Sequence, residues 1–307
     1  MDNIRVLLAT KKPFAQIAIQ KMEEALNAEN IQLERLEQYE TKEELIQKLP
    51  GVQALIVRSD KIDREIIEAA PDLKLLVRAG SGYDNVDIKA AHYAGVVVMN
   101  TPGQNANAVA ELVFGMLVFG ARNRFNGISG FELKGKTLGI HAFGNVGTNV
   151  ARIARGFGMH VLAYDPYTSA AIIERHGVEV VPTVEDLYQR SNIISLHLPF
   201  TPQTKEVINE ELISLMPRNG VIVNTARKEV INELELLKVL KQRPNMMFLT
   251  DIEPEYLDEF RALSDQFFAT PKKMGAQTKE ANMNAGVAAV KELIDFFKSG
   301  NVQFKVN

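Results

Sequence analysis

The chain has 307 residues, of which 46% are hydrophobic and 24% are charged, with a net charge of −3 and no cysteine. This composition is typical of a globular protein large enough for two domains with separate cores. It excludes disulfides and cysteine metal sites, and it provides no overall basic field for nucleic acid. Because no apolar run reaches the ~18 residues of a membrane span, we expect a cytoplasmic protein that contacts neither membrane nor nucleic acid. We also expect no metal site.

Short apolar runs alternate with amphipathic stretches through the N-terminal third of the chain. Strands are predicted at Ile4–Ala9, Ile31–Leu36, Ala54–Val57, Leu73–Arg78 and Val96–Met99, and helices at Phe14–Ala28, Lys42–Lys48, Ile62–Ala69 and Ile88–Ala94. This alternation indicates a doubly wound parallel α/β domain. Ligands of such sheets bind beyond the carboxyl ends of the strands, where Lys11, Arg58, Ser59 and Arg78 follow.

A long and almost entirely apolar stretch, Asn105–Arg122, predicts a helix that is buried between two packed units. A second α/β domain follows over Leu133–Phe268, and a last helix is predicted at Thr278–Ser299. The expected fold is therefore α/β, with two doubly wound parallel-sheet domains. The predicted boundaries assign residues 1–100 and 278–307 to a substrate-binding domain and residues 101–277 to a dinucleotide-binding Rossmann domain.

The stretch from Thr137 to Asp165 has the order strand, glycine loop, helix, strand and acid that binds dinucleotides. We expect Gly144 to let backbone N–H groups approach a pyrophosphate and Gly147 to let the helix pack close to the strand. Ala142 stands where the fingerprint has its first glycine, so an ordinary βαβ crossover with a glycine turn remains an alternative. The predicted loop contacts to the cofactor come from Phe143, Gly144, Asn145, Val146 and Gly147.

Asp165 ends the second strand, where an acid can accept hydrogen bonds from both ribose hydroxyls of a dinucleotide. The residues after it, Pro166 to Ser169, include no Arg or Lys that could hold a 2′-phosphate. The sequence therefore favours NAD over NADP as the cofactor.

Several stretches resemble the D-isomer-specific 2-hydroxyacid dehydrogenases, in family order and at family spacing. They are VRSDKIDREIIEAAPDLKLLVRAGSGYDNVDIKAA, NTPGQNANAVAEL, GKTLGIHAFGNVG, YDPY, SLHLPFTPQTKEVIN, VIVNTARKEVI and GAQTKEA. Within this family the chain is most similar to the branch that oxidises 3-phospho-D-glycerate to 3-phosphohydroxypyruvate, the first step of serine biosynthesis. The resemblance also implies cofactor contacts from His197, Pro199, Thr225, Ala226 and Asp251.

The family implies a catalytic Arg–Glu–His set. Its arginine corresponds to Arg227, whose planar fork would clamp the substrate carboxylate and keto oxygen. Its glutamate corresponds to Glu255 when one family residue is treated as deleted, with Glu253 as the alternative. Asp251 would reach the nicotinamide carboxamide.

The family's histidine is missing, because none of the five histidines lies after Arg227. Its Thr-Pro-His segment corresponds to Thr270-Pro271-Lys272, with one residue inserted before Gly275. We therefore expect Lys272 to be the general acid/base, with Lys273 as the alternative. In this respect the chain resembles a short subclass of the family, whose members have a lysine at this place. For His197 we favour a structural role at a strand end over proton transfer.

The resemblance implies a small phosphorylated 2-hydroxy acid as substrate and a homodimer as the assembly. Arg58 and Ser59 would hold the phosphate, with Lys11 or Lys12 either assisting or lying in a solvated loop; Arg78, Ser81 and Gly82 would complete the site. Two alternatives remain. One is a reductase of the glyoxylate, hydroxypyruvate or D-lactate type, and the other is a non-catalytic NAD(H)-sensing protein.

Overall fold

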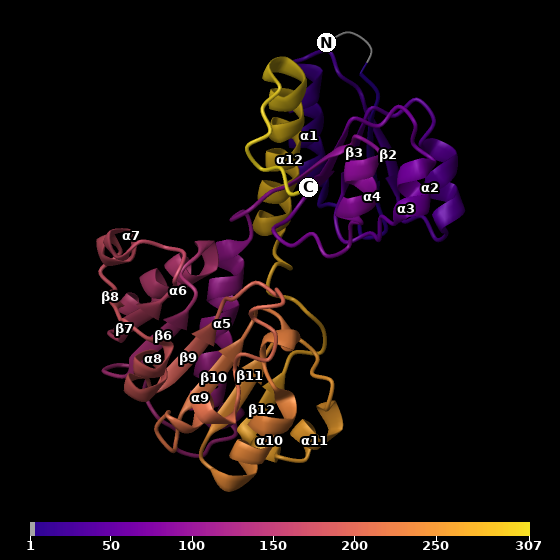
Figure 1. The fold of residues 1–307 in the computed structure, drawn as a ribbon. Coiled ribbons are helices and arrows are strands. Elements are labelled where there is room, and N and C mark those ends of the chain that lie inside the picture. Colours follow the sequence, from indigo (N-terminus) through magenta and orange to yellow (C-terminus); the bar gives the residue numbers. More distant parts are fainter. Residues whose placement is uncertain (1–3) are drawn as a thin grey trace. The chain divides into compact units, whose positions relative to one another are not determined.

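The computed structural model describes residues 4–307 and divides them into two compact units. Unit 1 contains the chain up to Asn105 together with Ala276–Asn307, and unit 2 is Ala106–Gly275. The chain thus changes unit a few residues from the boundaries expected from the sequence. Each unit is built around its own parallel sheet (Figure 1).

Unit 1 contains a five-stranded sheet in the order β2-β1-β3-β4-β5, in which every neighbouring pair is parallel. The strands are β1 (Val6–Thr10), β2 (Leu33–Glu37), β3 (Ala54–Val57), β4 (Leu75–Arg78) and β5 (Val97–Asn100). All residues of β1 and β3 are buried, as expected for central strands that are covered on both faces.

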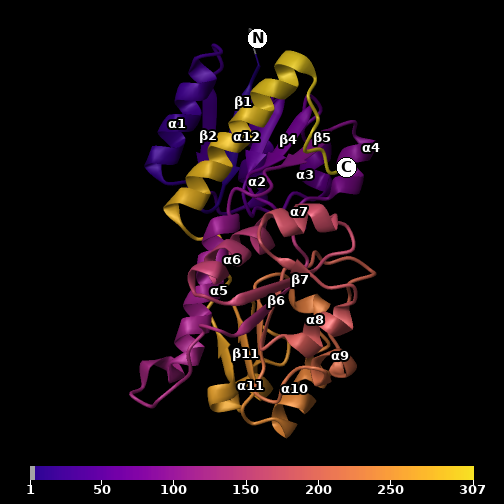
Figure 2. The same cartoon turned by 90° about the vertical axis from the view of Figure 1, so that its left-hand side faces the viewer.

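Helices cover both faces of this sheet. On one face, α1 (Gln16–Asn27) packs beside α12 (Lys279–Ser299), and Figure 2 shows α12 lying across the strands. The other face carries α2 (Lys42–Lys48), α3 (Arg64–Glu68) and α4 (Ile88–Tyr93). Local sequence fixes the helix ends: Thr41 and Glu44 form a capping box at the start of α2, and Gly300 ends α12 in the left-handed conformation.

Unit 2 contains a seven-stranded sheet in the order β12-β11-β10-β9-β6-β7-β8, again parallel throughout. Its strands are β6 (Thr137–His141), β7 (His160–Tyr164), β8 (Glu179–Val180), β9 (Ile193–Leu196), β10 (Val221–Asn224), β11 (Met247–Thr250) and β12 (Phe267–Ala269). The order reverses between β6 and β9, and such a switch point is where open α/β sheets bind ligands.

Two helical layers enclose the sheet of unit 2. One layer contains α5 (Ala106–Ala121), α6 (Asn145–Gly156) and α7 (Ala170–Arg175), with α5 packed against α6 and β11. The other contains α8 (Val184–Arg190), α9 (Glu210–Ser214), α10 (Glu233–Gln242) and α11 (Leu257–Arg261). Three short 3-10 helices, η1 (Asn123–Phe125), η2 (Lys228–Val230) and η3 (Ser264–Gln266), lie in the connections.

The structure confirms the predicted α/β class with two parallel sheets. The edge strands β8 and β12 were not predicted individually, because two or three residues give too short a pattern. Over residues 4–307, no helix is both long and apolar enough to cross a membrane. The same residues contain no group of three or more acids or histidines that could hold a metal ion.

Glu292 is an unusual acid because it lies on the buried side of α12. The residue is only 8% exposed, and its Oε2 atom has no hydrogen-bond partner within residues 4–307. Burial, together with nearby Asp295, raises the pKa of Glu292 to about 8. Its folded-state pKa therefore lies above that of an unfolded chain, so the stability contributed by the protonated form is lost as the pH rises through 8.

We predict that Glu292→Gln raises the unfolding temperature at pH 9 and leaves it nearly unchanged at pH 5. The amide stays neutral at both pH values, and about 1 kcal/mol corresponds to roughly 2–4 °C in a domain of this size. Thermal unfolding followed by circular dichroism measures the difference. Glu280→Gln, an exposed position on the same helix, is the control. A stabilisation of Glu292→Gln that is equal at both pH values would contradict the prediction.

Candidate active site

The glycine loop of unit 2 lies between β6 and the start of α6. Gly144 precedes α6, and a side chain at this position would point into open space, which leaves the backbone accessible. A Cβ atom at Gly147 would come within 2.7 Å of the carbonyl oxygen of Ala142, so only glycine permits this helix–strand packing. The first N–H groups of a helix have no intrahelical partner and favour an anion such as a diphosphate.

Ala142, which stands where the fingerprint has its first glycine, has a backbone conformation that suits glycine. Its φ angle is +76°, in the left-handed region that residues with a Cβ atom avoid. Such a conformation costs on the order of 1–3 kcal/mol and persists where the surroundings impose it. The loop therefore has a glycine-like conformation at this position although the sequence has alanine there.

Asp165 is hydrogen-bonded to the same loop. Its Oδ2 atom accepts from the backbone N–H of Phe143 at 2.7 Å and from the hydroxyl of Thr168 at 3.1 Å, and its Oδ1 atom accepts from the N–H of Tyr167 at 2.8 Å. A carboxylate has about four lone-pair sites, so acceptor capacity remains for ribose hydroxyls. Asp165 thus connects the end of β7 to the glycine loop.

Three buried side-chain oxygens in unit 2 have no hydrogen-bond partner within the described part of the chain: Oγ of Ser191, Oγ1 of Thr225 and Oδ1 of Asp251. The last two belong to residues expected to contact the cofactor. Unpaired buried polar atoms cost free energy and are rare in folded proteins. A hydroxyl and a carboxylate oxygen are suitable partners for the amide of a nicotinamide ring, so the residues present fit NAD.

Two cationic side chains converge on one backbone oxygen at the end of β10. The carbonyl of Ala226 accepts from Nη1 of Arg227 at 2.8 Å and from Nζ of Lys273 at 3.3 Å. Asn224 holds this turn, because its amide donates to the carbonyl of Arg227 and accepts from the N–H of Ala226. An arginine fork and an ammonium group therefore lie side by side at the carboxyl end of the sheet.

Asp251, at the end of the neighbouring strand β11, fixes the segment that carries Lys273. Its Oδ2 atom accepts from the N–H groups of Gly275 at 2.8 Å and Met274 at 3.3 Å. Burial raises the pKa of Asp251, and the Gly275 N–H and the positive charges of Lys273 and Arg227 offset part of that rise. The acid thus stabilises both the loop and the adjacent cations.

The structure brings Lys273 to this cluster, and it does not bring Lys272 there. Both lysines are exposed, but the Lys272 side chain makes no hydrogen bond or ion pair with residues 4–307, whereas Lys273 donates to Ala226. The sequence prediction counted forward from Thr270-Pro271 and therefore placed the inserted residue after Lys272. Counting back from Gly275, which Asp251 anchors, puts Lys273 in the position of the family histidine.

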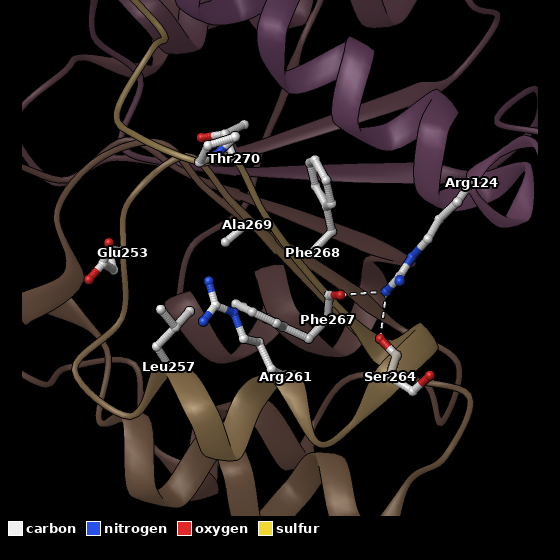
Figure 3. A pocket seen from close by; sticks show the side chains of 10 residues that line it. Arg124, Glu253, Leu257, Arg261, Ser264, Phe267, Phe268, Ala269 and Thr270 are labelled. Atoms are coloured by element: carbon white, nitrogen blue, oxygen red, sulfur yellow. Dashed lines mark hydrogen bonds between the residues drawn. The ribbon is translucent and has the colours of Figure 1, made fainter.

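The two candidate glutamates have different surroundings. Glu253 lines a cavity of about 340 Å³ beside the edge strand β12, together with Arg124, Arg261 and Thr270. In Figure 3, Arg261 reaches into this cavity while Arg124 bonds the carbonyls of Ser264 and Phe267. Glu255 lies two residues further along the chain, where its backbone N–H donates to Glu233 at 2.8 Å.

His197 follows β9 and bonds Ser195 through Nε2 at 2.9 Å. Burial, with a contribution from nearby His141, lowers the pKa of His197 to about 3. A ring that stays neutral over the physiological range is consistent with the structural role favoured from the sequence. Pro199, on the same segment, is exposed, and its carbonyl accepts from Thr204.

In unit 1, the guanidinium of Arg58 is engaged inside the fold. Its Nη1 atom donates to the carbonyls of Lys12 at 2.7 Å and Pro13 at 2.9 Å, Nη2 bonds the side chain of Asn282, and the group lies over the ring of Phe14. Burial lowers the pKa of Arg58. These contacts were not predicted, since the sequence placed Arg58 at the strand end as a phosphate ligand.

The remaining predicted residues of unit 1 lie at or after the ends of β1, β3 and β4. Ser59 and Lys11 line a cavity beside α2, whereas the hydroxyl of Ser81 donates to Asn105 at 2.9 Å. Asn100 holds the carbonyl of Ser81 at 2.5 Å, just before Gly82. Arg78 is the last residue of β4, so the strand ends bring these side chains to one edge of the sheet.

Residues 103–272 match the family model described as the D-isomer specific 2-hydroxyacid dehydrogenase, NAD binding domain. The chain belongs to this family. Its cofactor is NAD, in agreement with the glycine loop and with Asp165.

Among solved structures, the cofactor-bound 3-phosphoglycerate dehydrogenase of Entamoeba histolytica is 44% identical, with a TM-score of 0.91 over 99% of both chains. The D-3-phosphoglycerate dehydrogenase of Methanocaldococcus jannaschii is 38% identical over 82% of this chain and 51% of its own length. This chain thus spans about half of that relative. The hydroxypyruvate reductase of Thermotoga maritima is 37% identical over 85% of this chain and 90% of its own.

We predict that Asp165→Ala weakens NAD binding by about 10- to 100-fold, as expected for one or two lost hydrogen bonds to a charged acceptor. NADP binding should change much less, because its 2′-phosphate cannot use the carboxylate. Fluorescence titration with each dinucleotide measures both constants. If the unaltered protein binds NADP as tightly as NAD, Asp165 does not set cofactor choice.

Proposed function

We propose that this protein is an NAD-dependent dehydrogenase that oxidises 3-phospho-D-glycerate to 3-phosphohydroxypyruvate. The observation that carries the proposal is the pair of cations, Arg227 and Lys273, on the Ala226 carbonyl beside Asp251. A protein that only sensed NAD(H) would have no need to keep an arginine fork and an acid/base group together at the nicotinamide end. The phosphoglycerate dehydrogenases among its relatives support the choice of substrate.

In this mechanism Arg227 holds the substrate carboxylate and the oxygen on C2 through its planar fork. The Lys273 amine takes the hydroxyl proton as C2 loses its hydride. When bound, NAD supplies the hydride acceptor. Glu255 provides a negative charge that favours the ammonium form of the lysine after the proton has been transferred.

The phosphate would be bound in unit 1 by Ser59, with Arg58 or Lys11 supplying positive charge. One observation favours a second candidate, a hydroxypyruvate or glyoxylate reductase. The Arg58 guanidinium already donates to two carbonyls and to Asn282, which leaves fewer N–H groups for a phosphate. The similarity to a hydroxypyruvate reductase over 90% of that enzyme's length supports the same candidate.

We further propose that the protein acts as a homodimer. Phe125 and Ile128, in the segment that follows α5, are 66% and 67% exposed. Large apolar side chains on one short segment are typical of a surface that another chain covers.

The substrate assignment predicts the outcome of an activity panel followed by NADH absorbance. We expect phosphoglycerate oxidation and phosphohydroxypyruvate reduction to have the highest kcat/KM values. Glycerate, hydroxypyruvate, glyoxylate and D-lactate should be at least about tenfold poorer, since each lacks the phosphate contacts. A preference for hydroxypyruvate or glyoxylate would support the second candidate, and no turnover with any acid would indicate an NAD(H)-binding protein without activity.

The two adjacent lysines give a matched pair of variants. We predict that Lys273→Ala lowers kcat by roughly 100- to 10,000-fold, the usual contribution of a positioned acid/base, while the dissociation constant for NAD stays nearly unchanged. Lys272→Ala should keep most of its turnover, because its side chain lies outside the cluster. Steady-state kinetics of both variants decides the assignment. If only Lys272→Ala lost turnover, Lys272 would be the acid/base, as the alignment counted forward from Thr270 predicts.

A further inference from the structure

Glu233 is a buried acid near the proposed catalytic residues that the mechanism above does not use. It is the first residue of α10 and is 9% exposed. The preceding residue, Asn232, already caps the helix by accepting from the N–H of Glu235 at 3.2 Å. The carboxylate of Glu233 is therefore not needed as the cap and is directed to another segment.

That segment carries Glu255. A single oxygen of Glu233, Oε2, accepts from the N–H of Glu255 at 2.8 Å and from the N–H of Tyr256 at 3.1 Å. Pro254, which precedes them, has no N–H to donate. The carboxylate thus holds the two backbone groups on which the direction of the Glu255 side chain depends.

The other end of the segment is fixed as well. The hydroxyl of Thr250 accepts from the N–H of Ile252 at 3.0 Å and donates to the carbonyl of Asn224 at 2.9 Å. Asn224 is also the residue that holds the turn at Arg227. The start of the loop after β11 is therefore attached through Thr250 to the last residue of β10, and its far end is attached to Glu233, the first residue of α10.

The carboxylates of Glu233 and Glu255 also interact through their charges. Burial raises the pKa of Glu233, the two N–H donors and Lys228 lower it, and the charge of Glu255 raises it further. Two like charges repel each other, so the bond from the Glu255 N–H to Glu233 holds the Glu255 backbone without attracting its carboxylate.

We propose that Glu233 is a positioning residue that fixes Glu255 relative to Arg227. The proposal rests on the proposed dehydrogenase function. It also favours Glu255 over Glu253, since the N–H of Glu255 is bound to the first residue of α10, the helix that follows the loop carrying the arginine. Glu233 itself touches neither substrate nor cofactor.

The first test compares Glu233→Ala with Glu233→Gln. Alanine removes the acceptor, and a catalytic group displaced by about 1 Å can lose on the order of 100-fold in rate. We expect kcat to fall by about 10- to 100-fold, with the dissociation constant for NAD within about twofold of the original. The rising limb of the pH profile of oxidation, which follows deprotonation of the lysine, should move to lower pH, because the lysine is no longer near a fixed carboxylate. Glutamine keeps an acceptor oxygen and should restore most of the turnover.

The same helix offers a matched control. Glu235 also accepts a backbone N–H, that of Glu210 at 2.7 Å, and it connects α10 to α9. Glu235→Ala removes a contact of the same kind without touching the loop after β11. It should lower the unfolding temperature about as much as Glu233→Ala does and leave both kcat and the pH profile unchanged. Equal losses of turnover in the two alanine variants would reduce Glu233 to a general structural role.

A double-mutant cycle tests whether Glu233 acts through Glu255. In a Glu255→Ala background, Glu233→Ala should lower kcat no further, whereas independent effects would multiply and overturn the proposal. Amide hydrogen exchange gives a readout that requires no turnover: Glu233→Ala should speed exchange at Glu255 and Tyr256, and Glu235→Ala should not. If the original protein oxidises none of the acids, the proposed function fails while the exchange result still tests the attachment. Unchanged exchange would refute the attachment itself.

Discussion

The active site of unit 2 depends on one backbone carbonyl that gathers two positive charges. Arg227 and Lys273 repel each other, and they remain together because the Ala226 oxygen accepts from both and because Asp251 lies beside them. Asp251 contributes charge and also holds Met274 and Gly275 by their N–H groups. Removing this carboxylate would release the lysine segment and take away a negative charge that lies beside both cations, and burying it carries a desolvation cost.

The parallel sheet explains why these groups meet. Neighbouring parallel strands end at the same edge, so the loops after β10, β11 and β12 come together although they are distant in sequence. The same edge carries the glycine loop after β6 and Asp165 after β7. The unpaired oxygens of Thr225 and Asp251 belong to this edge too. The fold thus places at one edge both the groups that bond to each other and these two oxygens, which have no hydrogen-bond partner within residues 4–307.

The sequence predicted those features that depend on the local pattern of residues. Strand and helix periodicity predicted both sheets, and the acid at the end of β7 with its uncharged neighbours predicted NAD. The prediction held although alanine replaces the first glycine of the fingerprint, because the loop imposes a φ of +76° on Ala142, a residue type that rarely adopts it. Contacts between distant loops could not be predicted. The bonds of Arg58 to Asn282 and of Glu233 to Glu255 join residues whose spacing has no period, and the choice between Lys272 and Lys273 depended on which end of an inserted segment is anchored.

In the proposed reaction, the lysine in place of histidine and the deleted residue before Glu255 are connected by hydrogen bonding. A neutral imidazole that acts as a base has one N–H, and an acid must hold that N–H to present the other nitrogen. A neutral amine keeps two N–H groups, so Lys273 can donate to Ala226 and still direct its lone pair to a hydroxyl. The glutamate is then released from orienting the base and needs only to supply charge, which falls off gradually with distance. That weaker geometric demand accommodates a shortened loop, provided that the loop stays fixed, and the N–H bonds from Glu255 and Tyr256 to Glu233 fix it.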